Sequence, residues 1–158
     1  MISARKILIM GLPGSGKTTL ARELSLLLGA VVFDGDELRD NINRDLGFSK
    51  ADRREQAYRM GWLCNRVVEA GHSAIASFVC PTHRARQIFG PALIIWADRV
   101  KKSRFKDTDA IFEAPEVYDF RIGEDGSATT WALRIFQELV AAERAGSPMP
   151  GYSKGLAL

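Results

Sequence analysis

The segment from Gly11 to Thr18 constrains the fold more than any other part of this sequence. It reads GLPGSGKT and fits the pattern GxxxxGK[ST], with the apolar run Ile7–Met10 just before it. Leucines at helical spacing follow it within residues 16–28. An apolar strand, a glycine-rich turn and a helix, in this order, predict a buried strand of a parallel sheet that leads into a phosphate-binding loop.

Apolar strands and helical patterns alternate along the rest of the chain. We expect strands at 5–10, 30–33, 73–79, 92–96 and 118–122, and helices at 16–28, 37–46, 49–70, just after Pro81 and at 130–144. The polar stretch 98–115 shows little periodicity. The alternation predicts an α/β fold, a doubly wound parallel sheet of the P-loop NTPase type, and 158 residues suit one domain. We expect this domain to span residues 1–145 and a flexible tail to span residues 146–158.

Composition sets aside several other classes of protein. No apolar run is long enough to span a bilayer, so no membrane partner is expected. Cys64 and Cys80 lie far apart without a CxxC or Cys/His cluster, which argues against a disulfide framework and a structural zinc site and favours a reducing cytoplasm. The net charge of +3, without a long Lys/Arg run, is compatible with anionic substrates.

The glycine-rich loop predicts ATP and Mg²⁺ as cofactors. Glycines let successive backbone N–H groups face the phosphates, and we expect Lys17 to reach the β- and γ-phosphates and Thr18 to bind magnesium. The predicted ATP-binding residues are Gly11, Pro13, Gly14, Ser15, Gly16, Lys17, Thr18 and Thr19. The alternative is a glycine-rich turn without a ligand. No NKxD-type segment is present and the chain is short, which favours a small kinase over a GTPase switch or a motor.

Two carboxylates follow the second expected strand. In a doubly wound fold, Asp34 and Asp36 would lie opposite the phosphate loop, where they could accept the proton of an acceptor hydroxyl and orient hydrated magnesium. The alternative is a polar turn in which Asp36 caps the next helix. The phosphate loop upstream favours the functional interpretation.

The linked spacing of several segments resembles adenylylsulfate kinase over roughly the first 85 residues. These segments are Gly11–Thr19, DGDELR at 34–39, and DLGFS at 45–49 with Asp52, Arg53 and Glu55. The resemblance implies transfer of the ATP γ-phosphate to the 3′-hydroxyl of adenosine 5′-phosphosulfate (APS). It also implies that Asp34 and Asp36 act as base and magnesium-water ligands, with Thr18 and Asp36 as the metal-binding pair. Arg39, Phe48 and Arg53 would hold the anionic nucleotide acceptor, although each could instead be an ordinary surface or core residue.

The chain departs from the family pattern after residue 55. Gln56 stands in place of Asn, Phe78–Pro81 replaces a Ser-Pro segment, and the lysine-rich lid is missing. His83 and Arg86 keep a basic character near the changed segment, and we expect Arg86 to bind the acceptor. The segment 103–109 could form a shortened lid or a solvated charged loop. In a lid, one of four cations would approach the transferring phosphate, and Phe105 would contact the acceptor base. The four candidates are Arg99, Lys101, Lys102 and Arg104.

Two further functions remain open. Small proteins of this kind also resemble bacteriophage kinases that phosphorylate 5-hydroxymethyluracil in DNA, which would make DNA an acceptor. The chain could also be an ATP-gated nucleic-acid-binding module that grips phosphates with a basic helix near Arg84, but we find no basic stripe interleaved with aromatic residues. We expect Trp62, Trp96 and Trp131 to pack in the core. The oligomeric state is left open, a homodimer included.

Overall fold

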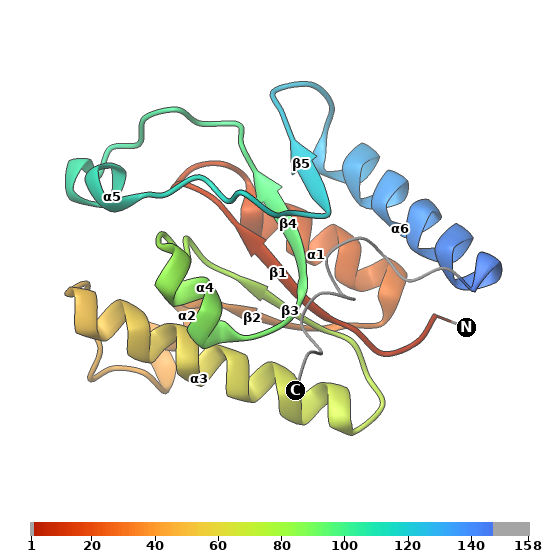
Figure 1. Cartoon of the computed structure of the whole chain (residues 1–158), viewed down its shortest axis with the longest axis horizontal. Coiled ribbons are helices and arrows are strands. Elements are labelled where there is room, and N and C mark those ends of the chain that lie inside the picture. The colour runs from red at the N-terminus through yellow and green to blue at the C-terminus, as the bar shows by residue number, and fades with distance from the viewer. Residues whose placement is uncertain (1, 147–158) are drawn as a thin grey trace.

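A computed structural model describes residues 2–146 as five strands and six helices (Figure 1). The strands are β1 (Lys6–Met10), β2 (Val31–Asp34), β3 (Ala74–Ser77), β4 (Leu93–Ala97) and β5 (Phe120–Ile122). The helices are α1 (Lys17–Leu28), α2 (Gly35–Asn41), α3 (Lys50–Glu69), α4 (His83–Phe89), α5 (Lys106–Ile111) and α6 (Ala128–Ala145). All strand pairs are parallel, in the order β2-β3-β1-β4-β5. The predicted doubly wound α/β fold is confirmed.

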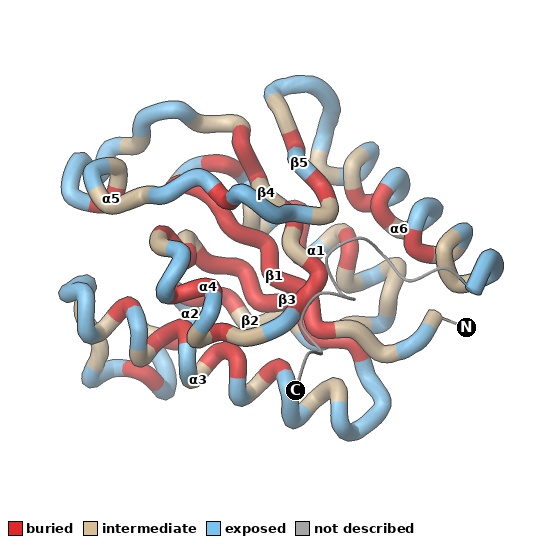
Figure 2. Tube along the Cα trace, in the orientation of Figure 1, coloured by how far each residue is buried: buried red, intermediate tan, exposed pale blue. Residues whose placement is uncertain are grey.

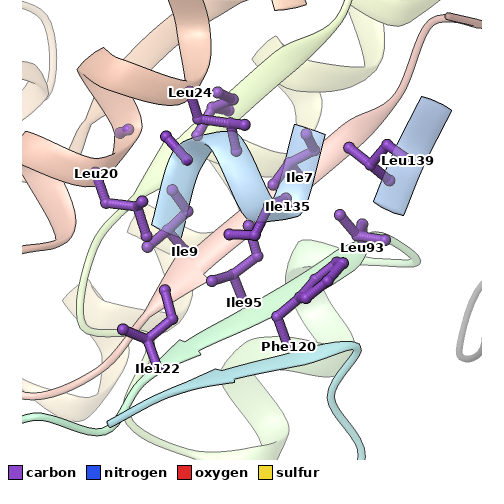
Figure 3. Close-up of a cluster of buried hydrophobic side chains, with 13 residues drawn as sticks. Ile7, Ile9, Leu20, Leu24, Leu93, Ile95, Phe120, Ile122, Ile135 and Leu139 are labelled. Carbon is purple, nitrogen blue, oxygen red and sulfur yellow. The ribbon is translucent and has the colours of Figure 1, made fainter. Parts of the chain in front are cut away.

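Both faces of the sheet are covered, so β1 is apolar at every position except its first. Ile7 and Ile9 point to one face, where they join a core under α1 and α6 (Figure 3). Leu8 and Met10 point to the other face and pack with side chains of α3 and α4. Alternate residues of a strand face opposite sides, which is why a strand between two helical layers reads as a continuous apolar run.

The order of the strands determines where a ligand-binding crevice can form. From β1 the chain crosses to β2 and β3 on one side and later to β4 and β5 on the other. The direction of winding therefore reverses beside β1, and a crevice forms beyond the carboxyl ends of the strands at such a point. The loop Gly11–Gly16 begins there. At Gly11, φ is +151° and an added Cβ would lie 2.4 Å from the carbonyl oxygen of Ala97, so only glycine fits against β4.

Several predicted details were wrong. The helix expected at 37–46 ends at Asn41, because the backbone N–H of Asn43 folds back to Leu38 and the Asn43 side chain is buried against Gln56. The aperiodic stretch contains the short helix α5. Trp62 is 51% exposed on α3 and does not lie in the core.

No helix among residues 2–146 is long and apolar enough to cross a membrane. The expected tail begins at Gly146, which caps α6, and its other residues lie outside the described part of the chain.

Candidate active site

A cavity of about 560 Å³ opens at the carboxyl ends of β1, β2 and β3. Five segments line it: the glycine-rich loop with the start of α1, the β2–α2 junction, Phe48–Gln56, the β3–α4 loop, and residues 104–108. The cavity therefore unites the predicted phosphate loop, the predicted carboxylates and most of the predicted acceptor residues.

The glycine-rich loop has the conformation that a phosphate site needs. Gly14 and Gly16 have φ of +81° and +82°, a left-handed conformation that favours glycine. Gly16 precedes α1 and offers no side-chain cap, so the first N–H groups of this twelve-residue helix have no capping side chain. Six of the predicted ATP-binding residues line the cavity: Pro13, Gly14, Gly16, Lys17, Thr18 and Thr19. Gly11 and Ser15 are buried and do not line it.

The side chain of Lys17 folds back onto the backbone of the glycine-rich loop. Its Nζ donates a hydrogen bond of 3.0 Å to the carbonyl oxygen of Leu12. Burial lowers the pKa of Lys17 to about 8, and the negative charges of Asp36 and Asp34 only partly oppose this shift. A bound anion would raise this pKa again and so stabilise the charged form of Lys17.

Asp34 connects the phosphate loop to α2. Its Oδ2 accepts a hydrogen bond of 2.7 Å from Oγ1 of Thr18, and its Oδ1 accepts from the backbone N–H groups of Asp36 and Glu37. Asp34 is therefore the N-cap of α2, so the alternative in which Asp36 caps this helix was wrong. The Asp36 side chain is exposed and lines the cavity.

A buried polar chain fixes the turn between these carboxylates. The Gln56 amide, fully buried on α3, donates to the carbonyl oxygen of Gly35 at 3.0 Å and accepts from Asn43 at 2.8 Å. An added Cβ on Gly35 would lie 2.8 Å from Cβ of Phe78, so the turn packs against the end of β3. Gln56 thus links α3 directly to the backbone between Asp34 and Asp36.

The acceptor side of the cavity carries the exposed ring of Phe48, with the guanidinium groups of Arg39 and Arg53 beside it. The Phe48 side chain is 60% exposed, and the guanidinium carbons of Arg39 and Arg53 lie 4.5 and 5.4 Å from its ring centre. Arg53 is buried and donates to the carbonyl oxygen of Phe48 at 3.0 Å and to Oγ1 of Thr108 at 2.9 Å. Burial lowers the pKa of both arginines, and the charge of Arg53 further lowers that of Arg39. Two desolvated cations beside an open ring form a site suited to an anionic aromatic ligand.

The segment before α5 closes one side of the cavity. Arg104 and Phe105 line it, with the guanidinium carbon 4.9 Å from the ring centre. The segment is anchored at Ser103, whose backbone N–H and Oγ both donate to the carboxylate of Asp109. Thr108 attaches it to α3 through Arg53.

Two arginines predicted as site residues, Arg86 and Arg99, do not line the cavity. Arg99 donates to the carbonyl oxygens of Glu124 and Gly126 at 3.2 and 2.9 Å. Arg86 is buried and donates to the carbonyl oxygens of Cys80 and Glu113 at 3.0 and 2.9 Å. Both guanidinium groups thus fasten loops in this structure, although the roles first expected of them stay predictions.

The β3–α4 loop that Arg86 fastens contains a strained residue. Cys80 is fully buried with φ of +44°, and burial raises the pKa of its thiol to about 12. The thiol is therefore protonated at neutral pH and unsuited to act as a nucleophile.

Several residues that line the cavity were not predicted as site residues, among them Gln56, Ser77, Phe78 and Thr108. Ser77 ends β3 and Phe78 follows it, and a strand end beside a phosphate loop is a usable signal for both. Gln56 occupies a position of the family pattern and was noted only as a departure. Thr108 lies in a stretch without periodicity, where nothing in the sequence indicates contact with Arg53.

Comparison with known proteins agrees with this geometry. The family model for adenylylsulphate kinase matches residues 3–93. The adenylyl-sulfate kinase of Geotalea daltonii is 42% identical over 94 residues, which cover 54% of this chain and 46% of that protein. The adenylyl-sulfate kinase of Shigella flexneri is 31% identical over an alignment of 159 positions, covering 82% of this chain and 79% of that protein.

The fold has a close match among solved structures. The Mycobacterium tuberculosis APS kinase CysC, solved in complex with AMPPNP and APS, superposes with a TM-score of 0.78, covering 89% of this chain and 99% of that one at 24% identity. The match to the Geotalea enzyme spans less than half of that enzyme's length, whereas the Shigella match spans most of both proteins. The family model, the sequence identities and the cavity agree: the chain belongs to the adenylylsulphate kinase family.

Proposed function

We propose that this chain is a kinase that transfers the γ-phosphoryl group of ATP to the 3′-hydroxyl of APS. The observation that supports this most directly is the exposed ring of Phe48 beneath Arg39 and Arg53, in the same cavity as Lys17 and Asp36. A ring and two guanidinium groups match the base and the anionic group of a nucleotide acceptor. The proposed setting is the reducing cytoplasm, where the two buried free thiols would stay reduced.

The donor side fits ATP with Mg²⁺. The open backbone N–H groups at the start of α1 and the buried ammonium of Lys17 would hold the phosphates. Magnesium prefers oxygen ligands and takes one or two carboxylates together with substrate phosphates. Thr18 and Asp34, joined through a 2.7 Å hydrogen bond, and the exposed Asp36 supply such oxygens. When bound, the ion would neutralise charge on the phosphates.

Different residues of the cavity would carry out the steps of phosphoryl transfer. In-line transfer requires the acceptor hydroxyl to be aligned with the γ-phosphorus and its proton to be accepted. Asp36, exposed to the cavity, is the better-placed base, because both oxygens of Asp34 already accept hydrogen bonds. Lys17 would offset charge that develops on the transferring group, while Arg104 and Phe105 would cover the acceptor side.

The test is ADP release from ATP and Mg²⁺ with three additions: APS, duplex DNA containing 5-hydroxymethyluracil, and no acceptor. Stimulation by APS alone is the expected outcome. Stimulation by the modified DNA alone would replace APS as the acceptor, and equal release in all three would contradict a transfer to either.

Two substitutions assign roles within the site. Lys17→Ala should abolish turnover while the fold persists, since removal of preorganised charge costs orders of magnitude in rate. Asp36→Asn should impair transfer more than ATP binding, because it removes the proposed base. The substitution should leave α2 intact, since Asp36 does not cap this helix. Asp40→Asn, an exposed carboxamide substitution on the same helix outside the cavity lining, is the matched control and should leave transfer unchanged.

A further inference from the structure

A second hollow of about 340 Å³ adjoins the acceptor side of the active site. Arg53 and Pro81 line both hollows, so the two share a wall between α3 and the β3–α4 loop. Apart from Arg53, the charged residues that line the second hollow are Lys50, Arg54, Arg84 and Glu113. Positive charge therefore dominates this hollow.

The three added cations are exposed and unpaired. Among residues 2–146, no carboxylate oxygen lies within 4.0 Å of the charged groups of Lys50, Arg54 or Arg84. The single carboxylate of the hollow, on Glu113, is engaged at 2.6 Å by the backbone N–H of His83. In contrast, Arg59 on the same helix is paired with two carboxylates. The three cations thus remain available to an external anion.

An exposed ridge continues from this hollow along α3. Arg54, Tyr58, Trp62 and Arg66 follow one another at four-residue spacing, which makes successive side chains neighbours on the helix surface. All four are exposed, Tyr58 and Trp62 by 56% and 51%. Figure 2 shows that exposed and buried stretches alternate along α3. The guanidinium carbon of Arg66 lies 5.4 Å from the Trp62 ring centre. Two neighbouring exposed rings are therefore flanked by two arginines, of which Arg66 is paired with Glu69 and Arg54 belongs to the second hollow.

We propose that the second hollow and this ridge bind a single-stranded nucleic acid. Phosphates would contact Lys50, Arg54 and Arg84, and unpaired bases would stack on Tyr58 and Trp62. A duplex hides the faces of its bases, and the Asp and Glu side chains of an acidic peptide have no rings, so the exposed aromatic pair favours a single strand. Because Arg53 and Pro81 belong to both hollows, the bound strand would pass the mouth of the acceptor site.

The experiment measures fluorescence anisotropy of fluorescein-labelled dT15 with the full chain, without ATP, at 50 and 200 mM NaCl. Three phosphate contacts at about −0.7 each give a salt slope of about −2, so affinity should fall about 20-fold between the two salt concentrations. Arg54→Glu should weaken binding at least about tenfold and Trp62→Ala at least about fivefold. The matched controls Arg134→Glu on α6 and Leu26→Ala on α1, both exposed, should change binding less than about twofold.

Three outcomes would overturn the proposal: no binding of dT15 at 50 mM NaCl, equal losses in the control variants, or binding of a polyglutamate peptide as tight as that of dT15. Thermal melting of each variant checks its fold, and Tyr58→Ala replaces Trp62→Ala if the latter does not fold. APS-dependent ADP release is measured on the same preparations. A chain that binds dT15 but releases no ADP with APS would refute the proposed function and leave this surface standing.

Discussion

Oγ1 of Thr18 donates a hydrogen bond of 2.7 Å to Oδ2 of Asp34 and thereby joins the first turn of α1 to the end of β2. The second oxygen of the same carboxylate accepts from the backbone N–H groups of Asp36 and Glu37. One buried side chain thus caps α2 and also meets the residue expected to bind magnesium. These two tasks can be separated by substitution.

Asp34→Asn and Asp34→Ala should differ in stability, but both should lose phosphoryl-transfer activity. Asparagine caps helices about as well as aspartate, so Asp34→Asn should melt close to the parent, while Asp34→Ala loses about 1 kcal/mol and melts about 2–4 °C lower. Both remove the negative charge beside Thr18 and should slow phosphoryl transfer at least about 100-fold. Thermal melts and ADP-release assays on both variants check this. If Asp34→Asn keeps full activity, Asp34 serves only as a cap.

Gly35→Ala should destabilise the chain because the added Cβ would lie 2.8 Å from Cβ of Phe78, an atom without rotamer freedom. Overpacking of this kind costs about 1–3 kcal/mol. The matched control is Gly123→Ala, whose added Cβ meets nothing within 4 Å and whose stability should change by less than about 0.5 kcal/mol. Urea unfolding of both variants measures the difference. Equal stability would mean that the turn can move away from β3.

The kcat/KM for ATP should fall as pH rises through the Lys17 pKa of about 8. Burial favours the neutral amine, so the free enzyme holds the charged form that phosphates require only below this pH. Above it, kcat/KM should fall about tenfold per pH unit, whereas kcat should change less because bound phosphates favour the ammonium form. In Lys17→Arg the fall should disappear, since a guanidinium stays charged. A flat parent profile to pH 9.5 would contradict the role of Lys17.

The sheet, its winding and the donor half of the site could be predicted because they depend on local signals. The apolar run of β1, the glycines at 14 and 16 and the helical leucines of α1 each have one dominant physical reason to be where they are. The sequence does not show whether Asp34 or Asp36 caps α2, because either residue could precede the helix. Only the start of α2 at Gly35 decides between them.

The acceptor half was harder because its walls meet over long sequence separations. Arg53 and Thr108 are 55 positions apart and share a 2.9 Å hydrogen bond, and no periodic pattern connects them. Arg86 is basic and near the site, yet its guanidinium serves the carbonyl oxygens of Cys80 and Glu113. Residue type alone does not distinguish a cation that fastens a loop from one that faces a ligand.

The hydrogen bond from Arg53 to Thr108 predicts a coupling between acceptor binding and stability. Thr108→Val removes the hydroxyl at nearly constant volume and leaves a buried guanidinium N–H without its partner, which costs about 1–3 kcal/mol. Arg53 also supports the backbone of Phe48 at 3.0 Å, so its displacement should move the ring. The KM for APS should therefore rise while the KM for ATP stays constant.

The control for this coupling is Asp107→Asn, because Asp107 is exposed and its carboxylate lies 4.0 Å from the same guanidinium. Exposed ion pairs contribute at most about 1 kcal/mol, so this variant should change neither KM by more than about twofold. Urea unfolding and initial rates over a matrix of ATP and APS concentrations test both variants. If Thr108→Val weakens ATP and APS equally, the segment 104–108 supports the whole cavity and not the acceptor side alone.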